Sequence, residues 1–194
     1  MTSDVILDRI QRMLKLDPRV FVEVRDDRQF TSVAAALAVG AVLIAALGAF
    51  LYGQTVFDFT PDNWFVETVV LGSLFTMILL AAGIAVTYVV LSQAYGVNIP
   101  PEGLARVLAL TYSFYAIGFL VFLPEVGFTF GVMLIAAMYY YSVEGLRAAA
   151  PGASATAAMV SVLAGFALWL TAMVLVSGPG DYFFTGVFVY SVLG

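Results

Sequence analysis

Long apolar stretches alternate with short polar segments from residue 31 onward, and this alternation predicts the architecture of the chain. The stretches cover residues 31–52, 66–92, 104–123, 126–141 and 156–176. A helix needs about 20 apolar residues to cross a bilayer, so we expect five spans, the second tilted and the fourth short. The predicted fold class is an all-α membrane protein, a five-span transmembrane helical bundle occupying residues 31–176.

Residues 1–30 are predicted to form a short amphipathic interfacial helix and a charged connector on the cytoplasmic side. The helix is expected over residues 4–16, and Pro18 ends it. Its apolar positions recur at helical spacing and are Ile6, Ile10, Met13 and Leu14. Anchoring on the membrane surface and packing beneath the bundle bury this same stripe, so the pattern favours both equally.

The tail, residues 177–194, is apolar but broken by glycines and a proline, and its last apolar run is too short to cross a bilayer. We expect it on the outer face, lying in the interface or against a partner. Its candidate contact residues are Phe183, Phe184 and Phe188.

All eight basic residues lie on one side of this layout. Six precede the first stretch, Arg106 lies between the second and third stretches, and Arg147 lies between the fourth and fifth. Short loops that contain Lys and Arg stay in the cytoplasm, so the N-terminus is predicted inside and the C-terminus outside. The first stretch is expected to direct insertion and to remain as a span rather than act as a cleaved signal.

The amino-acid composition limits the kinds of catalytic and metal-binding site that the chain can form. The chain is 62% hydrophobic and 11% charged and has neither Cys nor His, which removes thiolates, disulfides and the commonest general base and metal ligand. No ionisable residue lies near the middle of a predicted span, which argues against ion-coupled transport and most membrane enzymes. We therefore expect no catalytic residue, cofactor or metal. The absence of a net basic surface argues against nucleic acid as a partner.

Small residues mark the faces expected to make helix-packing or partner contacts. Such residues let neighbouring helices approach closely in a membrane. The candidates are Ala38 and Ala45 in the first stretch and Ala157, Ser161 and Gly165 in the fifth.

The polar candidates each have a plainer alternative. Arg106 and Arg147 can bind lipid headgroups or simply anchor the topology, and Glu102 is spaced to pair with Arg106 on one helix. An acidic outer loop can bind a hard cation or be only solvated; its residues are Asp58, Asp62 and Glu67. Three tyrosines can line a polar seam or pack between helices; they are Tyr88, Tyr112 and Tyr115.

Three local sequences lie at characteristic places in the predicted layout. Residues 95–102 (YGVNIPPE) lead into Arg106 before the third stretch, Leu123 and Pro124 lie between the third and fourth, and residues 144–157 precede the fifth. These sequences resemble the inner loop before the third span, the turn between the third and fourth spans and the inner loop before the fifth span of the Yip family, the Rab/Ypt-interacting five-span membrane proteins. The similarity covers residues 21–176.

One departure limits what the resemblance implies. Eukaryotic members carry an Asp-Leu-Tyr-Gly-Pro tract before the first span, and residues 1–30 contain no match to it. The resemblance therefore implies a prokaryotic-type member in the plasma (inner) membrane, without the Rab-binding role.

The expected function is that of a non-enzymatic membrane organiser, scaffold or accessory subunit of a larger membrane complex. Its partners would be membrane lipids and other integral membrane chains or a second copy. The alternative is a transport or channel module for a small or lipidic substrate. An enzyme using Tyr, Asp or Glu is a third hypothesis, which a pocket joining Glu102, Arg106 and Arg147 would favour.

The predicted orientation can be tested directly because the chain has no cysteine. A cysteine introduced at Thr55 should react with an impermeant thiol reagent added outside intact cells, and one at Ser3 should react only after lysis. The reverse labelling would overturn the orientation.

Overall fold

The computed structural model describes residues 3–56, 62–123 and 125–176, and every regular element in these ranges is helical. Within these ranges, four helical segments are long and apolar enough to cross a membrane. They are Arg28–Thr55, Val66–Ala94, Pro101–Phe122 and Ala155–Ala172. The chain is therefore an all-helical protein compatible with several membrane crossings. The fourth predicted stretch folds as a further helix, α6 (Gly127–Ala149), which is not among these four.

The helices follow the predicted apolar stretches to within a few residues, except that α6 ends at Ala149 instead of residue 141. The N-terminal elements are α1 (Ser3–Leu14), α2 (Pro18–Asp26) and the 3₁₀ turn η1 (Arg28–Phe30). The next are α3 (Thr31–Val56) and a continuous rod made of η2 (Val66–Leu71), α4 (Gly72–Val89) and η3 (Val90–Ala94), in which η2 and η3 are π-helical. The last are α5 (Pro101–Thr111), the 3₁₀ helix η4 (Tyr112–Phe122), α6 and α7 (Ala155–Val176).

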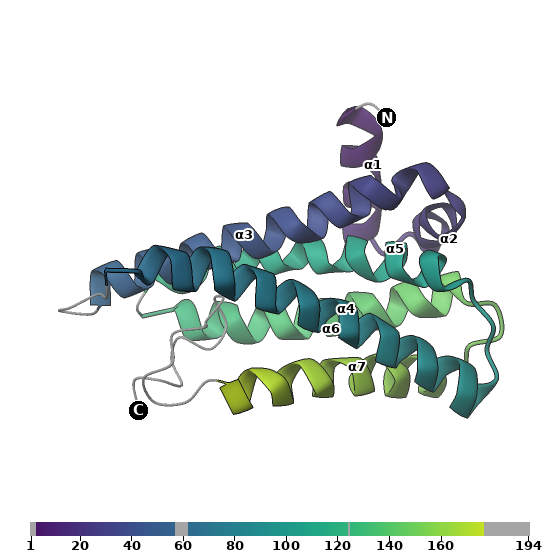
Figure 1. The fold of residues 1–194 in the computed structure, drawn as a ribbon. Helices are drawn as coiled ribbons and strands as arrows, with labels where there is room; N and C mark the ends of the chain where they lie inside the picture. The colour runs from purple at the N-terminus through teal and green to yellow at the C-terminus, as the bar shows by residue number, and fades with distance from the viewer. Residues whose placement is uncertain (1–2, 57–61, 124, 177–194) are drawn as a thin grey trace.

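The long helical segments of the described ranges, from α3 to α7, lie alongside one another, and α1 and α2 lie at one end of them (Figure 1). The α4–α5 and α6–α7 connections lie at this same end, which also contains the start of α3. Arg106 is in the second turn of α5, and Arg147 is in the last turn of α6. We call this end the basic end.

Helix α2 replaces the connector expected after Pro18. Proline fixes φ near −65° and lacks an N–H, so it ends one helix but suits the first position of the next. The Asp17 side chain accepts a hydrogen bond from the Arg19 N–H, and Pro18 occupies the first turn. The same residue that ends α1 thus begins α2.

Close backbone contact joins α3 to η4. A Cβ added at Gly48 would lie 2.3 Å from the Phe119 carbonyl oxygen, and one at Gly118 would lie 2.9 Å from the Ala45 Cβ. Ala45 is fully buried in this contact. Helix η4 is a 3₁₀ helix, which rises about 2.0 Å per residue, against 1.5 Å in an α-helix. A 3₁₀ helix as long as η4 is uncommon. The small residues of α3 provide the space for η4.

A second close contact joins α7 to α4. A Cβ added at Gly165 would lie 2.4 Å from the Thr87 Oγ1 and 2.5 Å from the Gly83 carbonyl oxygen. Ala157 and Ser161 are fully buried on the same helix. The small-residue stripe of α7 therefore packs inside this chain.

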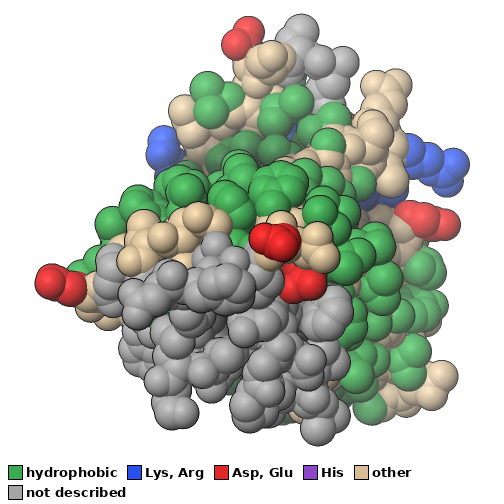
Figure 2. Space-filling model, turned by 60° about the vertical axis from the view of Figure 1, so that its left-hand side comes forward, with side chains coloured by type: hydrophobic (Ala, Val, Ile, Leu, Met, Phe, Trp, Pro, Cys, Tyr) green, Lys and Arg blue, Asp and Glu red, His purple; other side chains and the backbone are tan. Residues whose placement is uncertain are grey.

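The outward surfaces of the long helices are apolar. Leu74, Ile78 and Leu163 are each more than half exposed. Figure 2 shows hydrophobic side chains over much of the visible face, with Lys and Arg confined to its edges. An exposed apolar surface of this kind suits contact with lipid.

The α4–α7 contact predicts that Gly165→Leu destabilises the fold. The added side chain has no room beside Gly83 and Thr87, and overpacking of this kind costs about 1–3 kcal/mol. The unfolding temperature of the purified protein in mild detergent should fall by several degrees. Ala167→Leu is the matched control, because Ala167 is exposed on the same helix. Equal unfolding temperatures for both variants would show that this contact is absent.

Candidate functional site

Arg106 is the buried charge around which the basic end is built. It is 6% exposed. Its Nε donates to the carbonyl oxygens of Val24 at 3.0 Å and Arg25 at 3.2 Å. Its Nη2 also donates to the Arg25 carbonyl, and its Nη1 donates to the Thr31 Oγ1 at 3.1 Å. One side chain of α5 thus holds the end of α2 and the start of α3.

The physical chemistry of α2 explains this arrangement. The last carbonyls of a helix have no partner within it and form the negative end of its dipole. Val24 and Arg25 supply two of these carbonyls. A buried guanidinium and buried unpaired carbonyls are each costly, but paired they satisfy one another.

Two glycines let α2 seat on the long helices. A Cβ at Gly103 in α5 would lie 2.8 Å from the Arg25 Cγ, and one at Gly145 in α6 would lie 3.0 Å from the Phe21 ring. The Arg25 Nη1 also donates to the Ala149 carbonyl oxygen at 2.7 Å, at the end of α6. Helix α2 therefore contacts both α5 and α6.

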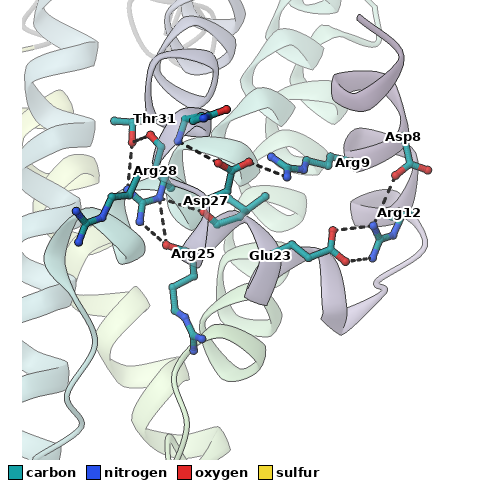
Figure 3. A network of polar contacts seen from close by, with 11 residues as sticks. Asp8, Arg9, Arg12, Glu23, Arg25, Asp27, Arg28 and Thr31 are labelled. Atoms are coloured by element: carbon teal, nitrogen blue, oxygen red, sulfur yellow. Dashed lines mark hydrogen bonds and ion pairs between the residues drawn. The ribbon is translucent and has the colours of Figure 1, made fainter. Parts of the chain in front are cut away.

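Ion pairs fasten α1 to α2. Arg12 binds both carboxylate oxygens of Glu23, at 2.9 and 2.8 Å (Figure 3). It also donates to Asp17 at 2.9 Å. Arg9 donates to Asp27 at 2.8 Å and lies over the Phe30 ring. The hydrogen bonds from Arg12 lower the pKa of Asp17 and of Glu23, and the hydrogen bond from Arg9 lowers the pKa of Asp27.

The residues of the apolar stripe predicted for α1 differ in how far they are buried. Met13 is buried and Ile10 is partly buried against the core, whereas Leu14 is 49% exposed. The Tyr141 hydroxyl of α6 donates to the Leu14 carbonyl oxygen at 3.0 Å. The end of α1 thus contacts the rest of the chain.

An open pocket of about 440 Å³ lies beside Arg106. It is lined by Arg25, Asp26, Arg28, Thr31, Pro100, Glu102 and Arg106. Arg25 binds Asp26 through two hydrogen bonds of 2.7 Å, which lowers the pKa of Asp26. The exposed Arg28 guanidinium has no hydrogen-bond or ion-pair partner within the described ranges. We call this hollow the arginine pocket.

The pair expected between Glu102 and Arg106 does not form. Both residues are described and line the arginine pocket, but the Arg106 guanidinium turns toward the α2 carbonyls. Glu102 lies exposed in the first turn of α5, where a carboxylate faces the positive end of the helix dipole. The tertiary acceptors outcompete the local pair because Arg106 is buried.

Arg147 lies outside the arginine pocket. It pairs with Glu144 at 2.8 Å, its side chain is 44% exposed, and it lines a separate hollow of about 290 Å³ with Leu16, Pro18 and Phe21. The structure therefore brings Glu102 and Arg106 to one pocket and places Arg147 in another.

An apolar groove of about 200 Å³ opens between α3 and α4. Ala38, one of the predicted contact residues, is partly buried and lines it, as do Ala35, Leu80 and Tyr112. The four other helical candidates, Ala45, Ala157, Ser161 and Gly165, are buried between helices of this chain. Phe183, Phe184 and Phe188 lie outside the described residues.

The remaining polar candidates do not converge on one site. Tyr112 and Tyr115 are buried, with the Tyr115 ring 6.1 Å from that of Trp169, and Tyr88 is only partly buried. Asp62 is exposed and Glu67 is half-buried, while Asp58 lies outside the described residues. Within the described ranges no three acidic side chains gather as metal ligands do.

Sequence reasoning missed α2 and the role of Arg106. Two signals were present: Asp17 followed by Pro18 is a helix start, and Val20, Phe21 and Val24 have helical spacing. The carbonyl partners of Arg106 left no such local signal.

Comparison of the chain with family models, curated proteins and solved structures finds no match. The Yip resemblance therefore rests on the residues quoted above alone.

Arg106→Met should destabilise the basic end. It leaves the carbonyls of Val24 and Arg25 buried without donors, at a cost of about 1–3 kcal/mol for each unsatisfied group. The unfolding temperature in mild detergent should fall, and protease cleavage between α2 and α3 should accelerate. Arg147→Met is the matched control, with an expected change within about 0.5 kcal/mol, because Arg147 is exposed. Indistinguishable variants would contradict the capping role of Arg106.

The attachment of α1 to α2 should weaken in acid. The pKa values of Asp17, Glu23 and Asp27 are lower than the ordinary carboxyl value of about 4. Their stabilisation is therefore complete above that range and is lost as pH falls through the lowered values. Spin labels on cysteines at Leu7 and Gln29 should show a distance that broadens below about pH 4.

Two controls accompany this acid titration. Arg12→Gln should broaden the label distance already at neutral pH, because it removes the partner of Glu23 and Asp17. Lys15→Gln should leave the pH profile unchanged. A label distance that stays constant down to pH 2 would show that these ion pairs do not hold α1.

Proposed function

We propose that this chain is a non-enzymatic integral membrane protein of Yip type that acts as a membrane organiser, scaffold or accessory subunit of a larger membrane complex. In this proposal all five long helical segments, α6 included, cross the plasma (inner) membrane of a prokaryote, and the basic end faces the cytoplasm. Helix α1 lies at the cytoplasmic membrane surface. Lipids and other integral membrane chains, or a second copy, are its partners.

The tight packing between α4, η4 and α7 is the observation that carries the proposal. The void there is only about 10 Å³ and is lined by Leu80, Gly83, Tyr112, Gly165, Phe166 and Trp169. This is about the smallest cavity that holds one water molecule. The same helices contain buried hydroxyls at Thr76, Thr87 and Ser161, and none of these three residues lines the void. Tight packing of this kind supports a structural role more than solute passage.

The alternative is a transport module for a small or lipidic substrate. The apolar groove between α3 and α4 favours a lipidic substrate over an ionic one, because its lining is apolar. A bound lipid is compatible with both functions. Movement of lipid across the bilayer would distinguish them.

The proposal is tested by reconstitution of the full chain into vesicles that contain fluorescent phospholipid. The labelled lipid should cross between leaflets no faster than in protein-free vesicles, and a trapped small solute should not leak. In mild detergent the native protein should co-purify at constant stoichiometry with another membrane chain or with itself. Rapid lipid or solute movement would overturn the proposal in favour of transport.

Deletion of residues 180–194 tests whether the tail makes the partner contacts. These residues lie outside the described ranges, and their role is inferred from their apolar sequence. The truncated chain should keep its unfolding temperature and lose its co-purifying partner. Retention of the partner at full stoichiometry would remove the tail as the contact element.

A further inference from the structure

The arginine pocket and the apolar groove lie next to each other along the same helices. On α3, Thr31 lines the pocket, and Ala35 and Ala38 line the groove one and two turns later. On α5, Arg106 lines the pocket and Ala109 lines the groove one turn later, and Tyr112, the first residue of η4, lines the groove almost one turn after that. At 1.5 Å per residue, each step from pocket to groove covers about 5–10 Å.

The arrangement of the helices opens this path sideways. Helices α3 and α4 diverge toward the end that carries α2, with α5 visible between them (Figure 1). The groove between them therefore opens on the flank of the helices, where exposed Val39 and Ala81 lie at its edges.

The pocket offers donors suited to an anion. Arg28 is exposed and has no partner within the described ranges. A guanidinium has five N–H donors, and the contacts of Arg106 leave one N–H free on each of its Nη atoms. Arg25 and Asp26 neutralise each other. Together with Glu102, the lining contains one more cation than anions.

We propose that the arginine pocket and the apolar groove form one binding site for an anionic phospholipid with a hydroxyl-bearing headgroup. The phosphodiester binds Arg28 and the free N–H groups of Arg106. A headgroup hydroxyl donates to the Glu102 carboxylate, which would repel a second negative charge. One acyl chain lies in the groove against Ala35 and Tyr112.

Charge and shape together select this occupant. An excess of one positive charge matches a headgroup that has one negative charge. The polar-to-apolar order along both α3 and α5 matches the order of phosphate and acyl chain in a lipid. The site rests on the proposed insertion in a bilayer but is independent of the organiser role, since either an organiser or a transporter can hold a lipid.

The test measures lipid binding to the full chain in detergent by native mass spectrometry. The probes are phosphatidylglycerol, phosphatidylcholine with the same chains, and inorganic phosphate. Phosphatidylglycerol should be retained at one molecule per chain and should bind at least about tenfold more tightly than phosphatidylcholine, as expected for one charge-assisted contact. Equal retention of the two lipids would overturn the charge assignment. Phosphate binding as tight as that of the lipid would overturn the role of the groove.

Matched variants test each half of the site. Arg28→Gln should weaken phosphatidylglycerol binding about tenfold, whereas Arg147→Gln, in the other hollow, should not. Ala35→Leu fills the groove and should also weaken binding, whereas Ala36→Leu alters an exposed neighbour that does not line the groove. All four variants should keep the unfolding temperature of the lipid-free protein.

The contrary outcomes are distinct. Equal losses from Arg28→Gln and Arg147→Gln would indicate a diffuse charged surface and reject the site. If Ala35→Leu dissociates a dimer and leaves lipid binding intact, a second copy occupies the groove instead. Loss of the organiser role in the reconstitution assay would leave these binding results unchanged, so the two proposals fail separately.

Discussion

The hydrogen bonds from Arg106 to the carbonyls of Val24 and Arg25 hold together the end of the molecule where the polar chemistry is gathered. These residues are more than 80 positions apart in the chain. Burial of the guanidinium or of the terminal carbonyls of α2 without a hydrogen-bond partner is unfavourable, and here each group is the partner of the other. Once α2 is fixed in this way, Arg12 and Arg9 can fasten α1 to it, and the face of Arg106 that remains open forms a wall of the arginine pocket.

The long helices obey a different constraint. Apolar surface gains little by leaving lipid for another helix, so helices in a membrane associate through close van der Waals packing. Gly48 against Phe119, and Gly165 against Gly83, bring backbones together in this way. The small residues Gly48, Gly118 and Gly165 lie in contacts within the chain, whereas Ala35 and Ala38 line the open groove between α3 and α4.

These two constraints give the packed long helices and the basic end different structures. The closed contacts of α3 with η4 and of α4 with α7 give a rigid support. The charged corner formed by α2, the start of α3 and the start of α5 gives a polar recess at one end of it. In the proposed lipid site, Glu102 would favour ligands with a single negative charge and a hydrogen-bond donor, because its carboxylate lines the same recess as Arg28.

The sequence by itself determined that the described part of the chain is helical, the approximate bounds of its long helices and the gathering of cations at one end. Hydropathy is a local property, and a segment of sufficient length in lipid must satisfy its own backbone hydrogen bonds, so a one-dimensional pattern predicts it. Only the tertiary structure decided which surfaces meet. The stripe of Ala157, Ser161 and Gly165 indicated close contact but not that α4 is the partner, and the spacing of Glu102 and Arg106 suggested a pair that burial overrides. The acceptors of Arg106 come from a helix distant in the chain, and their position depends on how α2 seats on Gly103 and Gly145, which no local pattern encodes.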